Sequence, residues 1–266
     1  MSSGSKGNAT LIQSAAGHHI LVDCGLSVSS LKTRLSAAGR KLEDIRAVLL
    51  THEHSDHSQG VATLSRKLGI PMYLTRGTYH AEHRAGRLKG EERVEIIDCH
   101  TGFELFDFQV QPVVVPHDAK EPCQYIFQSG DHRLGLLTDV GKITPHIIEH
   151  YTGCDALIVE ANHDPEMLRI GPYPPKLKQR VGGIYGHLSN QQTQAFLQAV
   201  ACERLKTLMI AHISEKNNSE QHVQNALESL DNIQHCDVHI AKQNTVMPWV
   251  NLAAKPPEAN REVYCG

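Results

Sequence analysis

Residues 49–60 read Leu49-Leu50-Thr51-His52-Glu53-His54-Ser55-Asp56-His57-Ser58-Gln59-Gly60, a polar segment that follows an apolar run and precedes a helical pattern. Three histidines and one aspartate within it are too many metal-binding side chains for an ordinary polar turn. The His-Glu-x-x-His motif of zinc proteases is excluded, because Asp56 stands where that motif needs its second histidine. Side chains alternate along an extended chain, so His52 and His54 can share one metal ion. Asp56 and His57 begin the following helix and can address a second ion.

The rest of the chain alternates short apolar runs with helical patterns. Runs rich in Val, Ile and Leu predict buried strands at residues 19–23, 47–50, 113–115, 134–137, 156–159 and 208–210. Apolar spacing predicts helices at residues 28–38, 61–68, 144–150, 190–202 and 220–230. Ser189 or Asn190, and Ser219, suit the N-cap positions of the last two helices.

Strands and helices mix along the whole chain, with no repeat and no low-complexity linker. This organisation predicts a single layered α/β domain over residues 1–266. Two polar segments interrupt it, at residues 77–90 and 164–186, and the second is rich in Pro, Gly, Lys and Arg. We expect both to be loop excursions that shape the mouth of a substrate site.

The composition narrows the functional classes. With 40% hydrophobic and 21% charged residues and no apolar stretch of membrane-spanning length, the chain is expected to be soluble and to have no membrane partner. Residues 1–17 are small and polar, without a secretory signal pattern, so a cytoplasmic location is expected. The net charge of −3 argues against a generic basic nucleic-acid coat protein, although a local basic patch can still guide a polyanion. The seven cysteines contain no Cys-x-x-Cys pair and are expected to be reduced. The 18 histidines point to metal or proton chemistry.

The run Thr51 to His57 resembles the signature of the metallo-β-lactamase superfamily, whose fold is an α/β four-layer αββα sandwich. Four more motifs resemble that superfamily in its order, each at the end of an apolar run: Leu21-Val22-Asp23-Cys24-Gly25, Val115-Pro116-His117-Asp118-Ala119, Leu137-Thr138-Asp139-Val140-Gly141 and Ile210-Ala211-His212-Ile213-Ser214. The resemblance implies that Asp23 supports the ligand loop, His117 completes the first metal site, Asp139 bridges the two ions and His212 binds the second. The competing interpretations are a strand-end cap for Asp23, a turn cap for Asp139 and surface positions for the two histidines.

This ligand set predicts two divalent metal ions, zinc or manganese with iron possible, from its mixture of imidazole and carboxylate groups. Two ions about 3.5 to 4 Å apart, bridged by Asp139 and a hydroxide, would supply a nucleophile at neutral pH. The resemblance also implies that Asp56 can hold the proton of the bridging water.

Other segments resemble the bacterial YycJ, or WalJ, group of this superfamily, regarded as 5′-to-3′ exonucleases on double-stranded DNA. They are residues 3–8, 116–119, 160–164, 186–190 and 211–218. The group usually has a short strand before the Ser-Gly-Ser turn, where this sequence has only Met1 and Ser2, so an edge strand is expected to be missing. Double-stranded DNA is therefore the expected substrate, and no obligate protein partner is evident.

Further residues are predicted to serve this site. Gly186 and His187 are expected to open a helix whose positive N-terminus suits a phosphate, with His187 donating a proton or stabilising charge. His163 and Asp164 either orient the ligands or close a turn with Pro165. A final group is expected to grip phosphates, stack bases or face the site, unless its members are simply solvated: Lys176, Lys178, Arg180, Tyr173, Ser5, Lys6 and Asn8.

Two rival functions remain open. One is a small-molecule hydrolase of the same fold, such as a cyclic phosphodiesterase or a thioesterase, which would use the same metal motifs; β-lactam hydrolysis is disfavoured because no signal peptide is visible. The other is a non-catalytic metal-binding regulatory protein, against which the complete ligand set argues.

Overall fold

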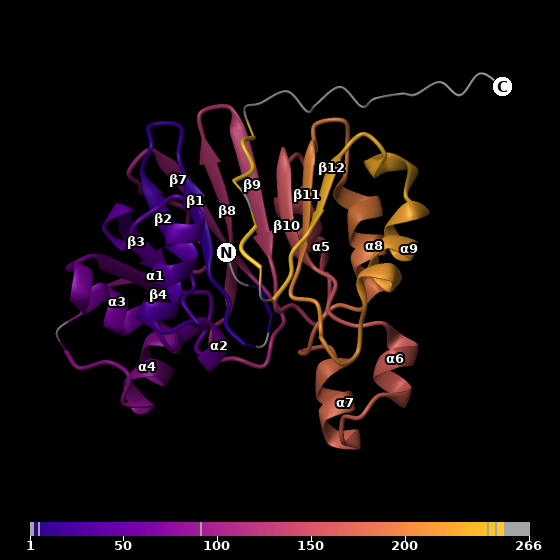
Figure 1. Ribbon diagram of the computed structural model, residues 1–266, viewed down its shortest axis with the longest axis horizontal. Helices are drawn as coiled ribbons and strands as arrows, with labels where there is room; N and C mark the ends of the chain where they lie inside the picture. The colour runs from indigo at the N-terminus through magenta and orange to yellow at the C-terminus, as the bar shows by residue number, and fades with distance from the viewer. Residues whose placement is uncertain (1–2, 5, 91, 244, 248, 253–266) are drawn as a thin grey trace.

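The computed structural model describes residues 3–4, 6–90, 92–243, 245–247 and 249–252. Two β-sheets face each other at the centre of the molecule, and helices cover the outer face of each sheet (Figure 1). Residues 10–97 form the first sheet and its helices, and residues 103–240 form the second sheet and its helices; the helices of the first lie on the left of the view and those of the second on the right. The predicted α/β class and its helix-sheet-sheet-helix layering are confirmed.

The first sheet has five strands in the order β1-β2-β3-β4-β5. They are β1 (Thr10–Gln13), β2 (His19–Val22), β3 (Ile45–Leu49), β4 (Pro71–Thr75) and β5 (Arg93–Ile97). β1 pairs antiparallel with β2, and the other neighbouring strands are parallel. The expectation of a missing edge strand concerns residues 1–2, which lie outside the described residues.

The second sheet has seven strands in the order β12-β11-β10-β9-β8-β7-β6. They are β6 (Phe103–Leu105), β7 (Phe108–Val114), β8 (Cys123–Ser129), β9 (His132–Leu137), β10 (Ala156–Glu160), β11 (Thr207–Ala211) and β12 (Asp237–Ile240). β9 to β12 are parallel to one another, while β6, β7, β8 and β9 pair antiparallel. β7 therefore runs in the same direction as β9.

The helices connect these strands and cap their ends. In the described residues they are α1 (Val28–Ala37), α2 (Ser55–Ser58), α3 (Val61–Leu68), α4 (Arg76–Arg84), α5 (Pro145–Tyr151), α6 (Pro165–Ile170), α7 (Pro175–Val181), α8 (Asn190–Val200) and α9 (Glu220–Glu228), with short 3-10 turns η1 (Leu42–Asp44) and η2 (Asp231–Ile233). Ser189 caps α8 in a capping box with Gln192, and Ser219 caps α9, as expected of these serines. None of the helices in the described part of the chain is long and apolar enough to span a membrane.

Alternation of side chains along the strands explains the layers. Ile20 and Val22 of β2 point into the space between the sheets, where they join Tyr125, Phe127 and Ile158 of the second sheet in one core. The side chains that point the other way pack beneath helices. In the first sheet Leu21 and Val48 pack with Leu31 and Leu35 of α1 and Leu64 of α3. In the second sheet Leu157 and Leu208 pack with Ile147 and Tyr151 of α5, Phe196 of α8 and Val223 of α9.

Several sequence predictions need correction. Strands β1, β4, β5, β6, β8 and β12 were not predicted, and the exposed pattern of β5 gave no buried run to detect. The two excursions are not simple loops, because α4 lies within the first and α6 and α7 within the second. Pro165 and Pro175 occupy the first turns of α6 and α7, where a missing N–H costs nothing, so proline there marks a helix start.

The strand directions bring the predicted motifs together. β2 and β3 are parallel, as are β9, β10 and β11, so the carboxyl ends of each set lie at one edge of its sheet. In Figure 1 this edge is the lower one, where α2 and α7 lie. The residues just after these strands are the ones that carried the predicted site.

Candidate metal centre

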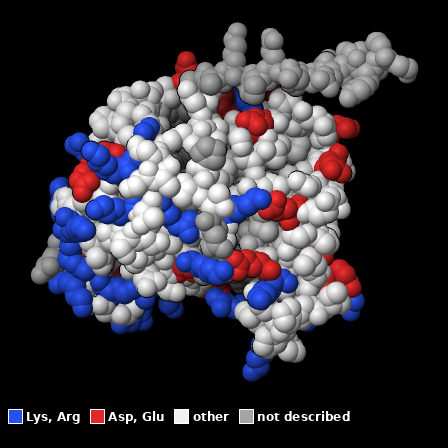
Figure 2. All heavy atoms as spheres, in the orientation of Figure 1, with Lys and Arg blue, Asp and Glu red and all other residues white. Residues whose placement is uncertain are grey.

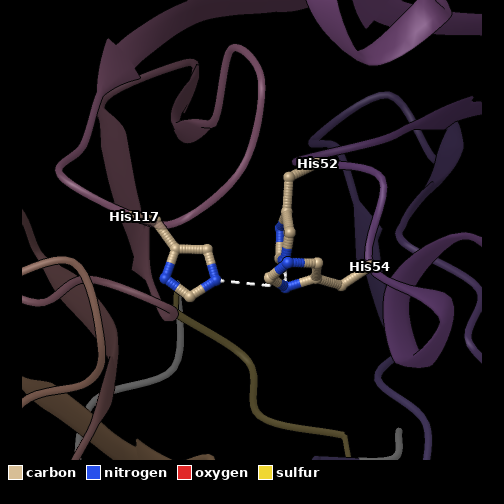
Figure 3. Close-up of side chains that lie close together, drawn as sticks. All are labelled: His52, His54 and His117. Atoms are coloured by element: carbon tan, nitrogen blue, oxygen red, sulfur yellow. Dashed lines mark hydrogen bonds between the residues drawn. The ribbon is translucent and has the colours of Figure 1, made fainter. Parts of the chain in front are cut away.

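His52, His54 and His117 form the first cluster of possible ligands. The chain after β3 passes through His52 and His54 into α2, while His117 stands on the loop that follows β7. His52 Nε2 lies 3.0 Å from His54 Nδ1, and His117 Nε2 lies 3.3 Å from the same atom. Figure 3 shows the three rings meeting from these two separate segments. Their nearest ring nitrogens all lie within 4.8 Å of one another.

The Nδ1 atoms of His52 and His117 have hydrogen-bond partners that fix the tautomer of each ring. The Nδ1–H of His117 donates to the carbonyl oxygen of Gly186 at 3.1 Å. Thr51 Oγ1 donates to Asp23 at 2.9 Å, which leaves it to accept from the Nδ1–H of His52 at 2.9 Å. The Nε2 atoms of His52 and His117 therefore present lone pairs to the space they share, as metal-ligating histidines do.

A second cluster contains Asp56, His57 and His212, whose ligand atoms also lie within 4.8 Å of one another. Asp139 lies between the two clusters. Its Oδ2 is 3.3 Å from His57 Nε2 and 3.3 Å from His212 Nδ1. Its Oδ1 is 4.0 Å from His117 Nε2 of the first cluster. One carboxylate thus faces both groups.

Asp23 holds in place the loop of residues 51–57, which carries His52, His54 and His57. Its carboxylate accepts the backbone N–H of Thr51 at 2.8 Å and the Nδ1–H of His57 at 2.8 Å. Asp23 and His57 are both buried, so these charge-assisted bonds are shielded from water. Asn8 also reaches the loop, with its Nδ2 2.9 Å from His57 Nε2 and hydrogen-bonded to the Asp56 carbonyl oxygen at 3.3 Å.

Three residues of the site have a left-handed backbone. Asp23, Asp139 and His212 have φ angles of 60°, 53° and 51°, and each stands just beyond the end of a strand. Side chains other than glycine adopt this region at a cost of about 1–2 kcal/mol. Such strain persists where the surrounding structure over-determines it, most often at functional sites.

Glu160, at the end of β10, was not predicted as a site residue. It is fully buried, and its Oε2 lies 3.1 Å from His187 Nδ1 and 3.4 Å from His212 Nδ1. Its Oε1 accepts the backbone N–H groups of Val140 and Leu188 at 2.9 and 3.0 Å. A carboxylate that ends an otherwise apolar run is the sequence signal that could have identified it.

The protonation states differ between the two clusters. Burial, with the nearby charge of His57, lowers the pKa of His52 well below its ordinary value, and burial also lowers the pKa of His117. Burial opposes protonation of His212, but Asp139 and Glu160 raise the pKa of His212 to about 10. His52 and His117 are therefore neutral and ready to bind a cation, whereas His212 must release a proton before its Nδ1 can bind one.

The geometry fits metal ions. Asp139 Oδ2 and His212 Nδ1 are buried and have no hydrogen-bond partner among the described residues, although they face each other. Tetrahedral ligands at 2.0–2.1 Å from one zinc ion lie about 3.3 Å apart, close to the nitrogen–nitrogen distances of 3.0 and 3.3 Å in the first cluster. Buried imidazole and carboxylate groups in this mixture suit zinc, manganese or iron.

The site opens into a cleft of about 400 Å³. Asp56 and His54 line one side, and Tyr173, Leu177 and Arg180 of the α7 region line the other. His187, on the loop before α8, also lines the cleft, and its Nδ1 donates to Glu160. Arg180 is tied to Asp118 at 2.5 Å, so the wall containing α7 is joined to the loop of His117.

The prediction that Gly186 and His187 open a helix is wrong. α8 begins at Asn190 after its cap at Ser189, and His187 lies two residues before that cap. The backbone N–H of His187 donates to the Val181 carbonyl oxygen at 2.9 Å, and that of Leu188 donates to Glu160. The nearby N–H groups are therefore occupied, and the positive end of a helix does not supply a phosphate site there.

The remaining predicted residues are not among the possible metal ligands of the described chain. Asp164 caps α6 by accepting the Met167 N–H at 2.9 Å, which favours the turn-closing alternative, while His163 is buried beside it with its Nδ1 unpartnered among the described residues. Lys178 donates to the Arg169 carbonyl oxygen at 2.7 Å, and Lys176 is exposed. Lys6 pairs with Glu215, and Ser5 lies outside the described residues. The six described cysteines are free, as expected.

Known proteins are similar to this chain in sequence and in fold. The family described as Beta-lactamase superfamily domain matches residues 18–213. Exodeoxyribonuclease YycJ of Bacillus anthracis is 33% identical over 224 residues, which cover 83% of each protein. Exodeoxyribonuclease WalJ of Streptococcus pneumoniae is 34% identical over 83% of this chain and 82% of its own length. The crystal structure of the metallo-beta-lactamase fold protein YhfI from Bacillus subtilis superposes with a TM-score of 0.67 at 17% identity, covering 91% of this chain and 95% of that one.

Proposed function

Since this chain belongs to the beta-lactamase superfamily, as its motif at residues 51–57 predicted, we propose that it is an exonuclease that digests double-stranded DNA from the 5′ end. The coarser conclusion, a metal-dependent hydrolase of the YycJ and WalJ group, follows from the family and the identity to those relatives. The identity of 33–34% to relatives named exodeoxyribonuclease carries the choice of a DNA substrate, and the position of Asp139 between two groups of possible ligands supports a two-metal mechanism. We also propose a cytoplasmic location, because that is where the protein would meet a DNA substrate.

The proposed ligands of the first ion are His52, His54 and His117, and those of the second are Asp56, His57 and His212, with Asp139 shared. Two divalent ions, zinc or manganese with iron as a further option, would lower the pKa of a water molecule to near neutrality and neutralise charge on the attacked phosphate. Asp23 and Thr51 keep the ligand nitrogens of His57 and His52 turned toward the ions.

Two side chains at the cleft, Asp56 and His187, are proposed to transfer protons. Asp56 lies at the cleft, with its Oδ2 3.6 Å from His57 Nε2, and accepts the proton of the attacking water. As an imidazolium, His187 would donate its Nδ1–H to Glu160 and give its Nε2 proton to the leaving oxygen, ending as the neutral ring. Burial opposes ionisation of Glu160, but His187 and His212 hold the pKa of Glu160 at about 2, so it remains an anion that orients the ring.

The shape of the cleft suits an enzyme that works at a chain end. Its volume of about 400 Å³ falls at the small end of ligand pockets, which span about 300–1,000 Å³. Such a space accommodates a terminal nucleotide and not the width of a duplex. Arg180 at the cleft and Lys176 and Lys178 nearby on α7 are proposed to contact the phosphates beside it.

The test is digestion of duplex DNA labelled at the 5′ or the 3′ end, with matched duplex RNA, by protein of measured manganese or zinc content. Loss of the 5′ label as mononucleotides is expected, and Asp139→Asn should abolish it while Asp237→Asn, on exposed β12, leaves it intact. Loss of the 3′ label first would reverse the proposed polarity. Protein with two ions that cuts no polymer but hydrolyses a cyclic phosphodiester or a thioester would replace the nuclease proposal with the small-molecule alternative.

A further inference from the structure

Positive charge is concentrated in one short stretch of this acidic protein. Residues 66–93 hold seven of the chain's 26 Lys and Arg residues in 28 positions, against three Glu residues, although the whole chain has a net charge of −3. Figure 2 shows Lys and Arg crowding the lower left of the molecule, where α3 and α4 lie in Figure 1, with few acidic side chains among them. The exposed members of this group are Lys67, Arg76, Arg84, Lys89 and Arg93.

Internal pairs neutralise two of the three acids in the stretch. The carboxylate of Glu82 is 1% exposed and binds Arg87 through three contacts of 2.6 to 2.9 Å. The Glu92 carboxylate is also 1% exposed and pairs with Arg66. The two buried acids therefore pair with Arg66 and Arg87, and the other five cations of the stretch face solvent. Among the described residues, the next exposed acids along the chain are Glu95 and Asp98, beyond the stretch.

The same stretch borders the metal centre. Arg87 Nη2 donates to the carbonyl oxygen of Glu53, which stands between His52 and His54, at 3.0 Å. At the other end of α4, the Gly77 N–H donates to Glu121, just after the loop of His117. α4 is therefore anchored to both ligand loops of the first cluster, on the side of the centre away from α7 (Figure 1).

We propose that Arg76, Arg84 and Lys89 form a basic track that binds the phosphate backbone of duplex DNA next to the cleft. The proposal rests on the proposed nuclease function and adds a second surface, across the centre from α7. α4 has nine residues and is about 14 Å long, which matches about four base pairs at 3.4 Å each. A duplex whose end enters the cleft would then be held on both sides of the cut.

The test compares two triple variants of the metal-loaded protein. The track variant is Arg76→Gln, Arg84→Gln, Lys89→Gln, and the matched control is Lys32→Gln, Lys41→Gln, Arg46→Gln, three exposed cations on α1, before η1 and at the amino end of β3. For each, kcat/KM is measured on a long DNA duplex over a range of salt concentrations, on matched duplex RNA, and on bis(p-nitrophenyl) phosphate, which is too small to reach the track.

The track variant should lose about tenfold or more in kcat/KM on the duplex, and the slope of log kcat/KM against log salt should flatten by up to about 2.7, at 0.9 for each phosphate contact. Its hydrolysis of bis(p-nitrophenyl) phosphate should match that of the unaltered protein, and the control variant should match in every assay. Equal duplex kinetics in the two variants would overturn the basic track. A loss confined to RNA would overturn the assignment to DNA. Failure of the unaltered protein to cut any DNA, with the small ester still hydrolysed, would instead refute the proposed function.

Discussion

The pair of Glu82 and Arg87 gives the most quantitative prediction, because one partner is buried and the other also holds the ligand loop. The Glu82 side chain is 1% exposed and that of Arg87 is 32% exposed, with contacts of 2.6 to 2.9 Å between them. Arg87→Met leaves the Glu82 carboxylate without its charge partner. Breaking a buried ion pair in this way costs about 3–5 kcal/mol, and the partial exposure of Arg87 places the expected loss near the lower value.

Arg84 provides the matched control for this change. It is the last residue of α4, is exposed, and among the described residues its side chain donates only to the His80 carbonyl oxygen, at 3.5 Å. Arg84→Met should therefore change the free energy of unfolding by less than about 0.5 kcal/mol. The double variant Glu82→Met, Arg87→Met should recover most of the stability, because no charge is then left buried alone. Urea unfolding of the metal-loaded proteins measures all three free energies.

Metal affinity should separate the two roles of Arg87. The single and the double variant both lose the hydrogen bond from Arg87 to the Glu53 carbonyl oxygen. That oxygen then keeps one side-chain donor among the described residues, Ser58 Oγ at 3.2 Å. Both should therefore bind zinc more weakly in competition with a chelator, by about tenfold, although only the single variant is destabilised. Equal stability of Arg87→Met and Arg84→Met would refute the argument from burial, and full zinc affinity in the double variant would refute the role in holding the loop.

Three further predictions test the support of the centre. Asp23→Asn should weaken zinc binding about 10- to 100-fold, because an amide cannot accept from Thr51 and His57 as the carboxylate does; chelator competition measures this, and unchanged affinity would contradict it. Gly25→Ala should destabilise the protein by about 3 kcal/mol or more, since a Cβ would lie 1.7 Å from the Asp56 carbonyl oxygen; Gly39→Ala, with open space around it, should cost only about 1 kcal/mol in the same urea experiment. In metal-free protein the pKa of His212 is raised to about 10, above about 6.5 in the unfolded chain, so the folded state binds the extra proton and stability should fall as the pH rises from about 6.5 to about 10. A His212→Gln variant should show a shallower fall, because His57 still contributes: burial opposes its protonation, but Asp139 and Asp23 raise the pKa of His57 well above its ordinary value. An identical pH profile in the two proteins would contradict the assignment.

The ligand motif and the strand-end positions could be predicted from the sequence because both depend on local spacing. The run from Thr51 to His57 has its potential ligands within a few residues: alternation along the extended segment puts His52 and His54 on one side, and the start of the following helix separates Asp56 and His57 from them. Asp23, His117, Asp139 and His212 each follow an apolar run, and parallel strands present their carboxyl ends at one edge. The α/β class followed from the same runs, and the four-layer αββα arrangement was implied by the resemblance.

Other features depend on contacts between segments far apart in the chain, which no local pattern contains. Glu160 faces His187 and His212, 27 and 52 positions away, because the pairing of β10 with β11 and the packing of the loop before α8 bring them together. The helices α4, α6 and α7 form in stretches that are polar and rich in glycine or proline, where tertiary anchors such as Arg87 to Glu53 hold them. The sequence by itself determined which side chains could bind metal; only the tertiary structure decided that Asp139 lies between the two clusters and that a basic surface borders them, because the distances between separate segments are set by strand pairing and core packing.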